Sequence, residues 1–146
     1  DNVFKYVNEV EIATNLKKSA VIFMGYPQNT CSGYYANILN EAAKDSGIKE
    51  ILYYDFYEDR MNHNATYQSI VLNLSNYLIT LDDGTKEIYA PTLVIVKDGK
   101  VIAFDNETAF VRGNLTPETY WNEYKTGAKY NLFKSMFKEY LKWKDS

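Results

Sequence analysis

The sequence has one cysteine, Cys31, and one histidine, His63, among 146 residues. A single cysteine excludes an intramolecular disulfide and the cysteine-rich zinc sites, and a single histidine excludes a histidine-rich metal site. The acidic residues lack the spacing of a calcium-binding loop. We therefore expect neither a metal nor a cofactor.

Long apolar runs and an excess of basic residues are missing as well. No run reaches the length of about 20 residues that a membrane-spanning helix needs. The 16 basic residues are outnumbered by 19 acidic ones, and the net charge is −3. Because a surface that binds phosphates must be basic, this balance argues against a nucleic-acid partner. The share of hydrophobic residues, 46%, is typical of a globular protein, and the length fits one domain over residues 1–146.

Short apolar runs alternate with segments of helical spacing along the chain. Continuous apolar runs predict buried strands, and apolar residues at every third or fourth position predict amphipathic helices. The expected strands are residues 3–7, 20–24, 50–55, 92–96 and 101–104, and the expected helices are residues 9–18, 35–46, 67–78 and a last helix from 117 that breaks near Gly127. Strand–helix–strand units pair in parallel, and the Asp98-Gly99 turn adds an antiparallel hairpin. The pattern predicts an α/β fold with a central mixed sheet and helices on both faces.

Local signals mark the ends of these elements. Gly47 is a typical helix stop, and Thr116 followed by Pro117 is a typical helix start. The polar run "EDRMNHNAT", residues 58–66, predicts a loop that exposes His63 to solvent. A base acting on Cys31 is the less favoured role for this histidine.

The stretch "GYPQNTCSGYY", residues 25–35, contains the only cysteine and leads from a buried strand into a helix. Asn29 is a good N-cap for that helix. Cys31 would lie in the first helical turn, where the helix end lowers a thiol pKa and favours a reactive thiolate. Free cysteine is also a commonly buried small hydrophobe, so the sequence leaves a reactive and a structural thiol open. We expect Tyr34 to form a contact surface and Tyr35 to pack inside.

Several features together resemble thioredoxin-fold proteins, and most of all the group of bacteriocin transport accessory proteins. They are "VIFMGYP" before a helix, "LNEAAK" on that helix, "YYDFYEDR" after it, "IYAPTLVIVKDGKVIAF" with a proline before a strand, and the long final helix. The likeness extends from about Phe4 to the region after Phe104. It implies a thioredoxin-like α/β fold in which residues 1–146 form one domain with a C-terminal helical extension.

In that group the stretch resembles GYP-x-C-x-x-C. An ungapped alignment puts the two cysteine positions on Asn29 and Ser32, so the motif reads Asn29-Thr30-Cys31-Ser32 and both redox cysteines are absent. A shifted alignment would make Cys31 the first position and Tyr34 the second. We prefer the ungapped alignment because "YP" and "LNEAAK" anchor both sides of the motif.

Two functions from different classes follow from the missing cysteine pair. Thiol–disulfide exchange needs an attacking thiolate and a second thiol that resolves the mixed disulfide, so dithiol oxidoreductase activity is not expected. The favoured hypothesis is an accessory or binding protein that keeps a peptide-docking groove with a cis proline. The resemblance places this groove at Tyr26, Tyr34, Ala90 and Pro91, with Ala90-Pro91 in the cis form. The alternative is a monothiol thioredoxin-like oxidoreductase that uses Cys31.

The resemblance also suggests where the protein works and what it binds. The resemblance to this group implies that the protein comes from a Gram-positive bacterium and is secreted or is a lipoprotein. We therefore expect an extracytoplasmic location, with anchoring to the membrane through an N-terminal segment that has been removed. The expected partner is a protein or a peptide.

Overall fold

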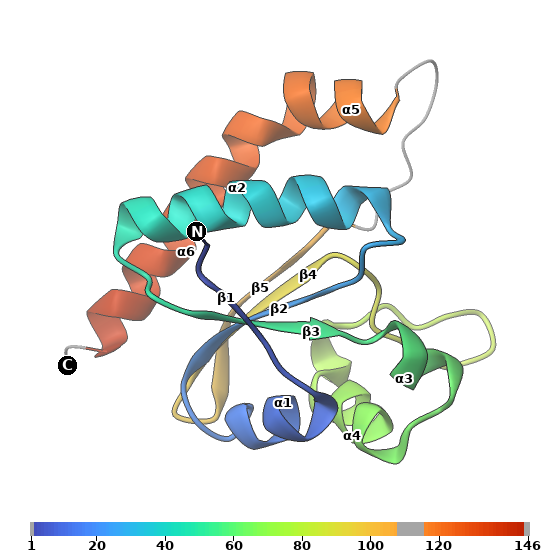
Figure 1. Cartoon of the computed structure of the whole chain (residues 1–146). Helices are drawn as coiled ribbons and strands as arrows, with labels where there is room; N and C mark the ends of the chain where they lie inside the picture. The colour runs from blue at the N-terminus through green and yellow to red at the C-terminus, as the bar shows by residue number, and fades with distance from the viewer. Residues whose placement is uncertain (1, 108–115, 145–146) are drawn as a thin grey trace.

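One five-stranded sheet forms the centre of the protein in the computed structural model, which describes residues 2–107 and 116–144 (Figure 1). The strand order is β1-β3-β2-β4-β5. The strands are β1 (Phe4–Tyr6), β2 (Ala20–Gly25), β3 (Ile51–Asp55), β4 (Thr92–Lys97) and β5 (Lys100–Asn106). The first three strands pair in parallel, whereas β4 is antiparallel to β2 and β5 is antiparallel to β4.

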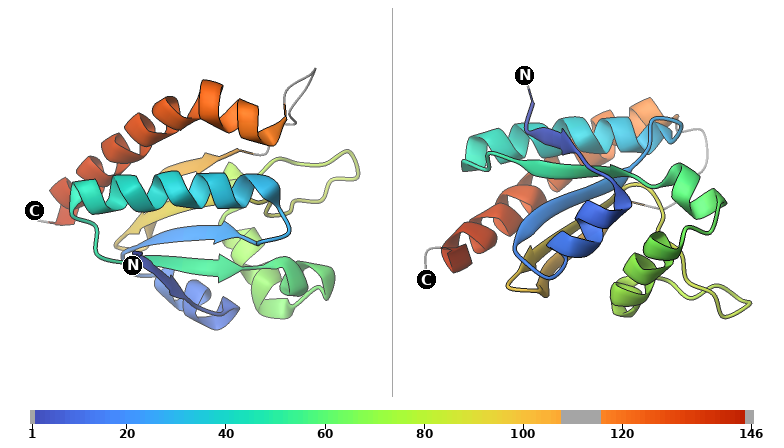
Figure 2. Two further views of the ribbon diagram at one scale, coloured as in Figure 1. Left: turned by 45° about the horizontal axis from the view of Figure 1, so that its top comes forward. Right: turned by 60° about the horizontal axis from the view of Figure 1, so that its bottom comes forward.

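Helices cover both faces of this mixed sheet, as the sequence predicts (Figure 2). One face carries α2 (Thr30–Ser46) and α6 (Thr126–Lys144). The short helix α5 (Pro117–Thr119) and a π-helical segment, η2 (Tyr120–Lys125), lead directly into α6. The opposite face carries α1 (Glu9–Asn15), α3 (Tyr57–Met61), α4 (Ala65–Asn73) and the 3₁₀ turn η1 (Ser75–Tyr77). The expected α/β fold is confirmed.

The central strand β2 separates two hydrophobic cores. Its side chains alternate between the faces, so Val21 and Phe23 pack beneath α2 and α6, while Ile22 and Met24 pack toward α1 and α4. All six residues of β2 are buried, which explains why its sequence is continuously apolar rather than alternating. Each large side chain that is fully buried contributes roughly 1.5–3 kcal/mol, so the burial of Ile22, Phe23 and Met24 stabilises the strand that leads into the motif.

Several local signals are confirmed at single residues. Gly47 ends α2 with a left-handed φ of 84°, a conformation that glycine adopts without a steric penalty. Asp98 and Gly99 both have positive φ and connect β4 to β5, as a tight hairpin requires. The Thr116 side chain caps α5, and Pro117 occupies its first turn.

Two expectations about helix boundaries are wrong. The run 58–66 is not a loop, because α3 covers its first residues and α4 begins at Ala65, where the Asn64 side chain caps the helix by accepting from the Tyr67 N–H at 2.9 Å. Polar composition was misleading here because short surface helices expose most of their side chains. The last helix does not break at Gly127. A glycine costs an exposed helix only about 1 kcal/mol, and the irregular segment η2 lies before it.

Candidate functional site

The motif Asn29–Ser32 forms a closed turn between β2 and α2. Asn29 is the N-cap, and its side-chain oxygen accepts from the Ser32 N–H at 2.8 Å and from the Ser32 hydroxyl at 3.2 Å. The Tyr26 N–H donates to the Ser32 hydroxyl oxygen at 3.4 Å. Ser32 is only 2% exposed. The two positions that would carry redox cysteines are therefore in contact, and they hold the turn together by hydrogen bonds.

Close packing around Gly25 fixes this turn against the sheet. A β-carbon at Gly25 would lie 2.9 Å from the Ser32 hydroxyl and 2.9 Å from the Phe23 ring. Real β-carbons do not approach so closely, so a side chain here would displace the turn. The glycine is needed for the approach of α2 to β2.

Cys31 lies in the first turn of α2 and is half-buried. It packs against the core beneath α2 together with the half-buried Tyr34. The Tyr34 ring lies nearly parallel to the buried Trp121 ring, at a centroid distance of 6.3 Å. The thiol is thus neither fully enclosed nor freely exposed. Tyr35 is fully buried, as expected from the sequence.

A buried charged network lies under the same end of α2. The Lys129 Nζ is 2.8 Å from an oxygen of Asp105 and 3.1 Å from an oxygen of Glu107. The Tyr35 hydroxyl donates to Asp105 at 2.6 Å, and the Tyr120 hydroxyl donates to Glu107 at 2.6 Å. The Lys129 ammonium group therefore bridges two carboxylates, that of Asp105 in β5 and that of Glu107 directly after β5.

Two tyrosines of this network resist ionisation. Burial, followed by the charge and the hydrogen bond of Asp105, holds the pKa of Tyr35 well above its ordinary value. Burial, followed by the hydrogen bond and charge of Glu107, raises the pKa of Tyr120, and Cys31 adds a smaller rise. Cys31 and Tyr120 also pack against the same core beneath α2.

Sequence reasoning missed this network because its members are far apart in the chain. One signal was present. Lys129 precedes Phe133 by four residues and Met136 by seven, so it shares the buried face of α6 with them. A lysine on an apolar helical face needs a buried anionic partner, and β5 supplies it.

The predicted groove residue Pro91 lies beside Gly25, the first residue of the stretch 25–35. The Ala90-Pro91 peptide bond is cis, as expected. Thr92 pairs with Met24 in the antiparallel ladder, so the next position, Pro91, lies opposite Gly25. Tyr26 follows directly, half-buried and edge-on to Phe56. The structure thus places Pro91 beside Gly25 and Tyr26, the first two residues of the stretch 25–35.

Among the described residues, three of the four backbone carbonyls of residues 88–91 accept a hydrogen bond, and the fourth, that of Ala90, does not. The carbonyl oxygens of its neighbours accept from Arg60 Nη1 (Ile88, 3.0 Å), from the Thr92 hydroxyl (Tyr89, 2.6 Å) and from the Glu107 N–H (Pro91, 3.2 Å). Within residues 2–107 and 116–144, the N–H and C=O of Ala90 make no hydrogen bond. The Ala90 side chain itself is only 6% exposed and packs into the core beneath α1 and α4.

Arg60 covers the Tyr26 side of this segment, a contact that the sequence did not indicate. Its guanidinium lies over the rings of Tyr26 and Tyr89, 5.6 Å from each centroid, and donates to the Tyr26 hydroxyl at 3.2 Å. Cations over aromatic faces are stabilising. His63, in contrast, is exposed between α3 and α4, as expected.

The described residues contain no group of three or more histidine, cysteine or acidic side chains that could hold a metal ion. In the same part of the chain, no helix combines the length and the apolar character needed to cross a membrane.

No family model and no curated protein matches the chain. Among solved structures, it is similar to a cysteine-to-serine mutant of Entamoeba histolytica thioredoxin, with 16% sequence identity, 71% of this chain and 86% of that chain covered, and a TM-score of 0.36. A TM-score this low carries no argument by itself. The thioredoxin-like α/β fold follows instead from the strand order β1-β3-β2-β4-β5 and from the directions of β4 and β5.

Proposed function

We propose that this protein is a thioredoxin-like binding module that docks an extended peptide beside Ala90-Pro91 and carries out no dithiol chemistry. One observation carries the proposal. Ala90 is the residue in the segment 88–91 whose carbonyl has no partner among the described residues, although it is nearly buried. An unpaired buried backbone group costs roughly 1–3 kcal/mol, and an incoming strand that pairs with it recovers that free energy.

The chemistry of the motif supports binding over catalysis. Exchange of disulfides needs two thiols, whereas Asn29 and Ser32 form a hydrogen-bonded cap at the corresponding positions. Binding through backbone groups requires no thiol. The fold therefore keeps a use after the loss of the cysteine pair.

Nuclear magnetic resonance with a defined probe tests this function. We expect carboxymethylated insulin B chain, an unfolded peptide without free thiols, to slow amide exchange at Ala90 and to shift the signals of Tyr26 and Tyr34. Tyr34→Ala should weaken binding. Tyr77→Ala is the matched control, because Tyr77 is also a partly exposed tyrosine stacked on a neighbouring ring. Unchanged exchange at Ala90 under saturating peptide would refute the proposal.

A second candidate, a monothiol oxidoreductase, is favoured by the half-buried position of Cys31 in the first turn of α2. In such an enzyme the Cys31 thiolate would attack the disulfide of a substrate, which releases one substrate thiol and leaves a mixed disulfide on Cys31. A small thiol cosubstrate would then attack that mixed disulfide and release Cys31 as a thiol. Rapid labelling of the native protein by iodoacetamide would support it. Labelling only after denaturation would leave a structural thiol and remove this candidate.

The partner and the location belong to the same proposal. The resemblance to bacteriocin transport accessory proteins supports a protein or peptide partner and a location outside the cytoplasm of a Gram-positive bacterium, with attachment to the membrane. The sequence of the full gene and fractionation of the producing cells test this location.

A further inference from the structure

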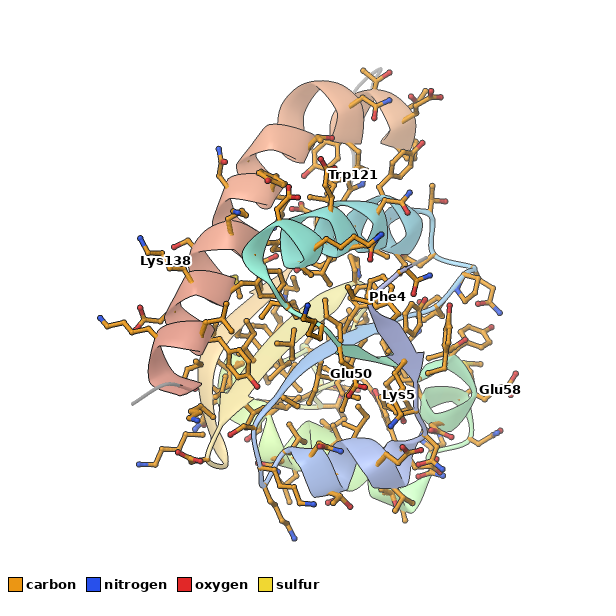
Figure 3. The ribbon with its side chains drawn as sticks, turned by 60° about the vertical axis from the view of Figure 1, so that its left-hand side comes forward. Phe4, Lys5, Glu50, Glu58, Trp121 and Lys138 are labelled. Carbon is orange, nitrogen blue, oxygen red and sulfur yellow. The ribbon has the colours of Figure 1, made fainter. Side chains whose placement is uncertain are left out.

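A groove between α2 and the edge strand β1 lies at the opposite side of the sheet from β4. Its volume is about 430 Å³, and all of the described residues that line it are uncharged. The aromatic residues Phe4, Tyr6 and Tyr53 form the sheet side, and Gly33, Asn37 and Asn40 are part of the helix side. Figure 3 shows Phe4 on the part of β1 next to α2, with Lys5 nearer to α1.

Asparagine side chains make this groove rich in hydrogen-bond donors. The side-chain oxygen of Asn40 accepts from the Val3 N–H at 2.9 Å, and that of Asn29 accepts from the Ser32 N–H at 2.8 Å. These bonds fix the orientation of both amides. Their NH₂ groups donate to no residue in the described part of the chain, and Asn37 is exposed. The groove therefore suits a ligand that presents carbonyl oxygens.

The open edge of β1 adds backbone groups to the same groove. The carbonyl of Val3 accepts from β3 at 2.9 Å, and the N–H of Val7 donates to β3 at 3.0 Å. In a parallel pair the bonding direction alternates along the strand, so the carbonyl of Phe4 and both backbone groups of Tyr6 point away from β3. No strand lies beyond β1 in the sheet of the described residues.

We propose that this groove binds an extended peptide, uncharged on its groove-facing side, as a sixth strand along β1. Backbone pairing with Tyr6 sets its position, and asparagine NH₂ groups meet its outer carbonyls. Its alternate side chains rest on Phe4, Tyr6 and Tyr53, where a charge would be desolvated without a partner. Lys5 on this edge discourages pairing between two copies, because like charges on adjacent strands repel. The site shares no unpaired backbone group with Ala90 and is independent of the proposed function.

Selection from a display library of short random peptides provides the ligand, and fluorescence anisotropy of the enriched peptides measures affinity. Gly33→Leu should fill the groove and weaken binding about tenfold or more. A β-carbon at Gly33 has no atom within 4 Å, so the fold tolerates the change. Gly127→Leu is the matched control, since Gly127 is also an exposed helical glycine with open space around it, and should leave affinity unchanged.

A second pair of variants isolates the backbone contact. Tyr6→Pro removes an N–H that points away from β3, which an edge strand accommodates, whereas Tyr6→Val removes the ring but keeps the N–H. Binding should be about three to ten times weaker in Tyr6→Pro than in Tyr6→Val, the effect of one lost hydrogen bond. Exchange of the Tyr6 amide should slow when peptide is bound.

Several outcomes would overturn the proposal. They are a selection that enriches no peptide, peptides that bind Gly33→Leu as well as the parent, and equal affinities of the two Tyr6 variants. Binding of neutral oligosaccharides in place of peptides, lost in Gly33→Leu, would assign the groove to sugars instead. Peptides that protect Ala90 rather than Tyr6 would also overturn it, and would support the proposed function alone.

Discussion

Replacing Lys129 by methionine should strongly destabilise the protein. The side chain is 10% exposed and is the cation shared by Asp105 and Glu107, whose side chains are 16% and 6% exposed. Methionine fills a similar volume but removes this cation from beside the two carboxylates. Removing one partner of a buried ion pair costs about 3–5 kcal/mol. In a chain of this size each kcal/mol lowers the melting temperature by roughly 2–4 °C, so the expected fall is about 6–20 °C.

Urea denaturation followed by circular dichroism at pH 7 measures the difference in the free energy of unfolding between the variant and the parent.

Lys138→Met is the control for this prediction. Lys138 lies on the same helix but is exposed, and Figure 3 shows it on the outer side of α6. Its replacement should change the free energy of unfolding by no more than about 0.5 kcal/mol. Equal effects of the two substitutions would refute the stabilising role of the ion pairs that Lys129 makes with Asp105 and Glu107.

Three further predictions concern the motif and its surroundings. The double change Asn29→Cys with Ser32→Cys should form a disulfide on mild oxidation, because the side chains of residues 29 and 32 are already in contact. If mass spectrometry finds both thiols free, the ungapped alignment of the motif is wrong. Gly25→Ala should lower stability by about 1–3 kcal/mol, whereas Gly33→Ala, in open space, should raise it by about 0.5–1 kcal/mol; similar values in chemical denaturation would contradict the packing described for Gly25. Burial and Asp105 raise the pKa of Tyr35, so the neutral Tyr35 side chain stabilises the folded state fully below about pH 10, and this stabilisation is lost as the pH rises further. In a titration at high pH, part of the tyrosinate absorbance should therefore appear only when the protein unfolds.

Local rules predicted most of the fold because the signals lie within a few residues of one another. The apolar runs of β2 and β4, the left-handed stop at Gly47 and the Asp98-Gly99 turn each depend on backbone preferences or on burial on both faces of a sheet. Such preferences act wherever the residues occur. The helix α3 was missed because its stability comes from contacts that composition does not encode, such as the hydrogen bond from the Tyr54 hydroxyl to Asp59.

The site was predicted less completely because its contacts connect distant segments. The place of Cys31 in the first helical turn followed from one stretch, and the cis Ala90-Pro91 bond followed from a resemblance, whereas the burial of the thiol stayed open. The Lys129 network joins β5 to α6, and the Arg60 guanidinium crosses from α3 to the carbonyl of Ile88. Each requires the strand order to be known before the partners can be paired. The spacing of apolar residues can locate a charged residue on the buried face of a helix, but it cannot identify the residue of opposite charge that pairs with it.

Backbone groups, rather than a reactive side chain, are the common element of the two candidate binding surfaces. Ala90 offers them on the side of β4, and Tyr6 offers them on the open edge of β1. The turn capped by Asn29 lies at the end of β2, between these two strands in the sheet, and its hydrogen bonds involve Asn29, Ser32 and Tyr26 but not the Cys31 thiol. Neither surface therefore depends on a cysteine pair. Substitutions that preserve the turn and the sheet edges keep the backbone groups of both surfaces in place, so the proposed pairing of a peptide with these backbone groups does not require cysteines in the motif.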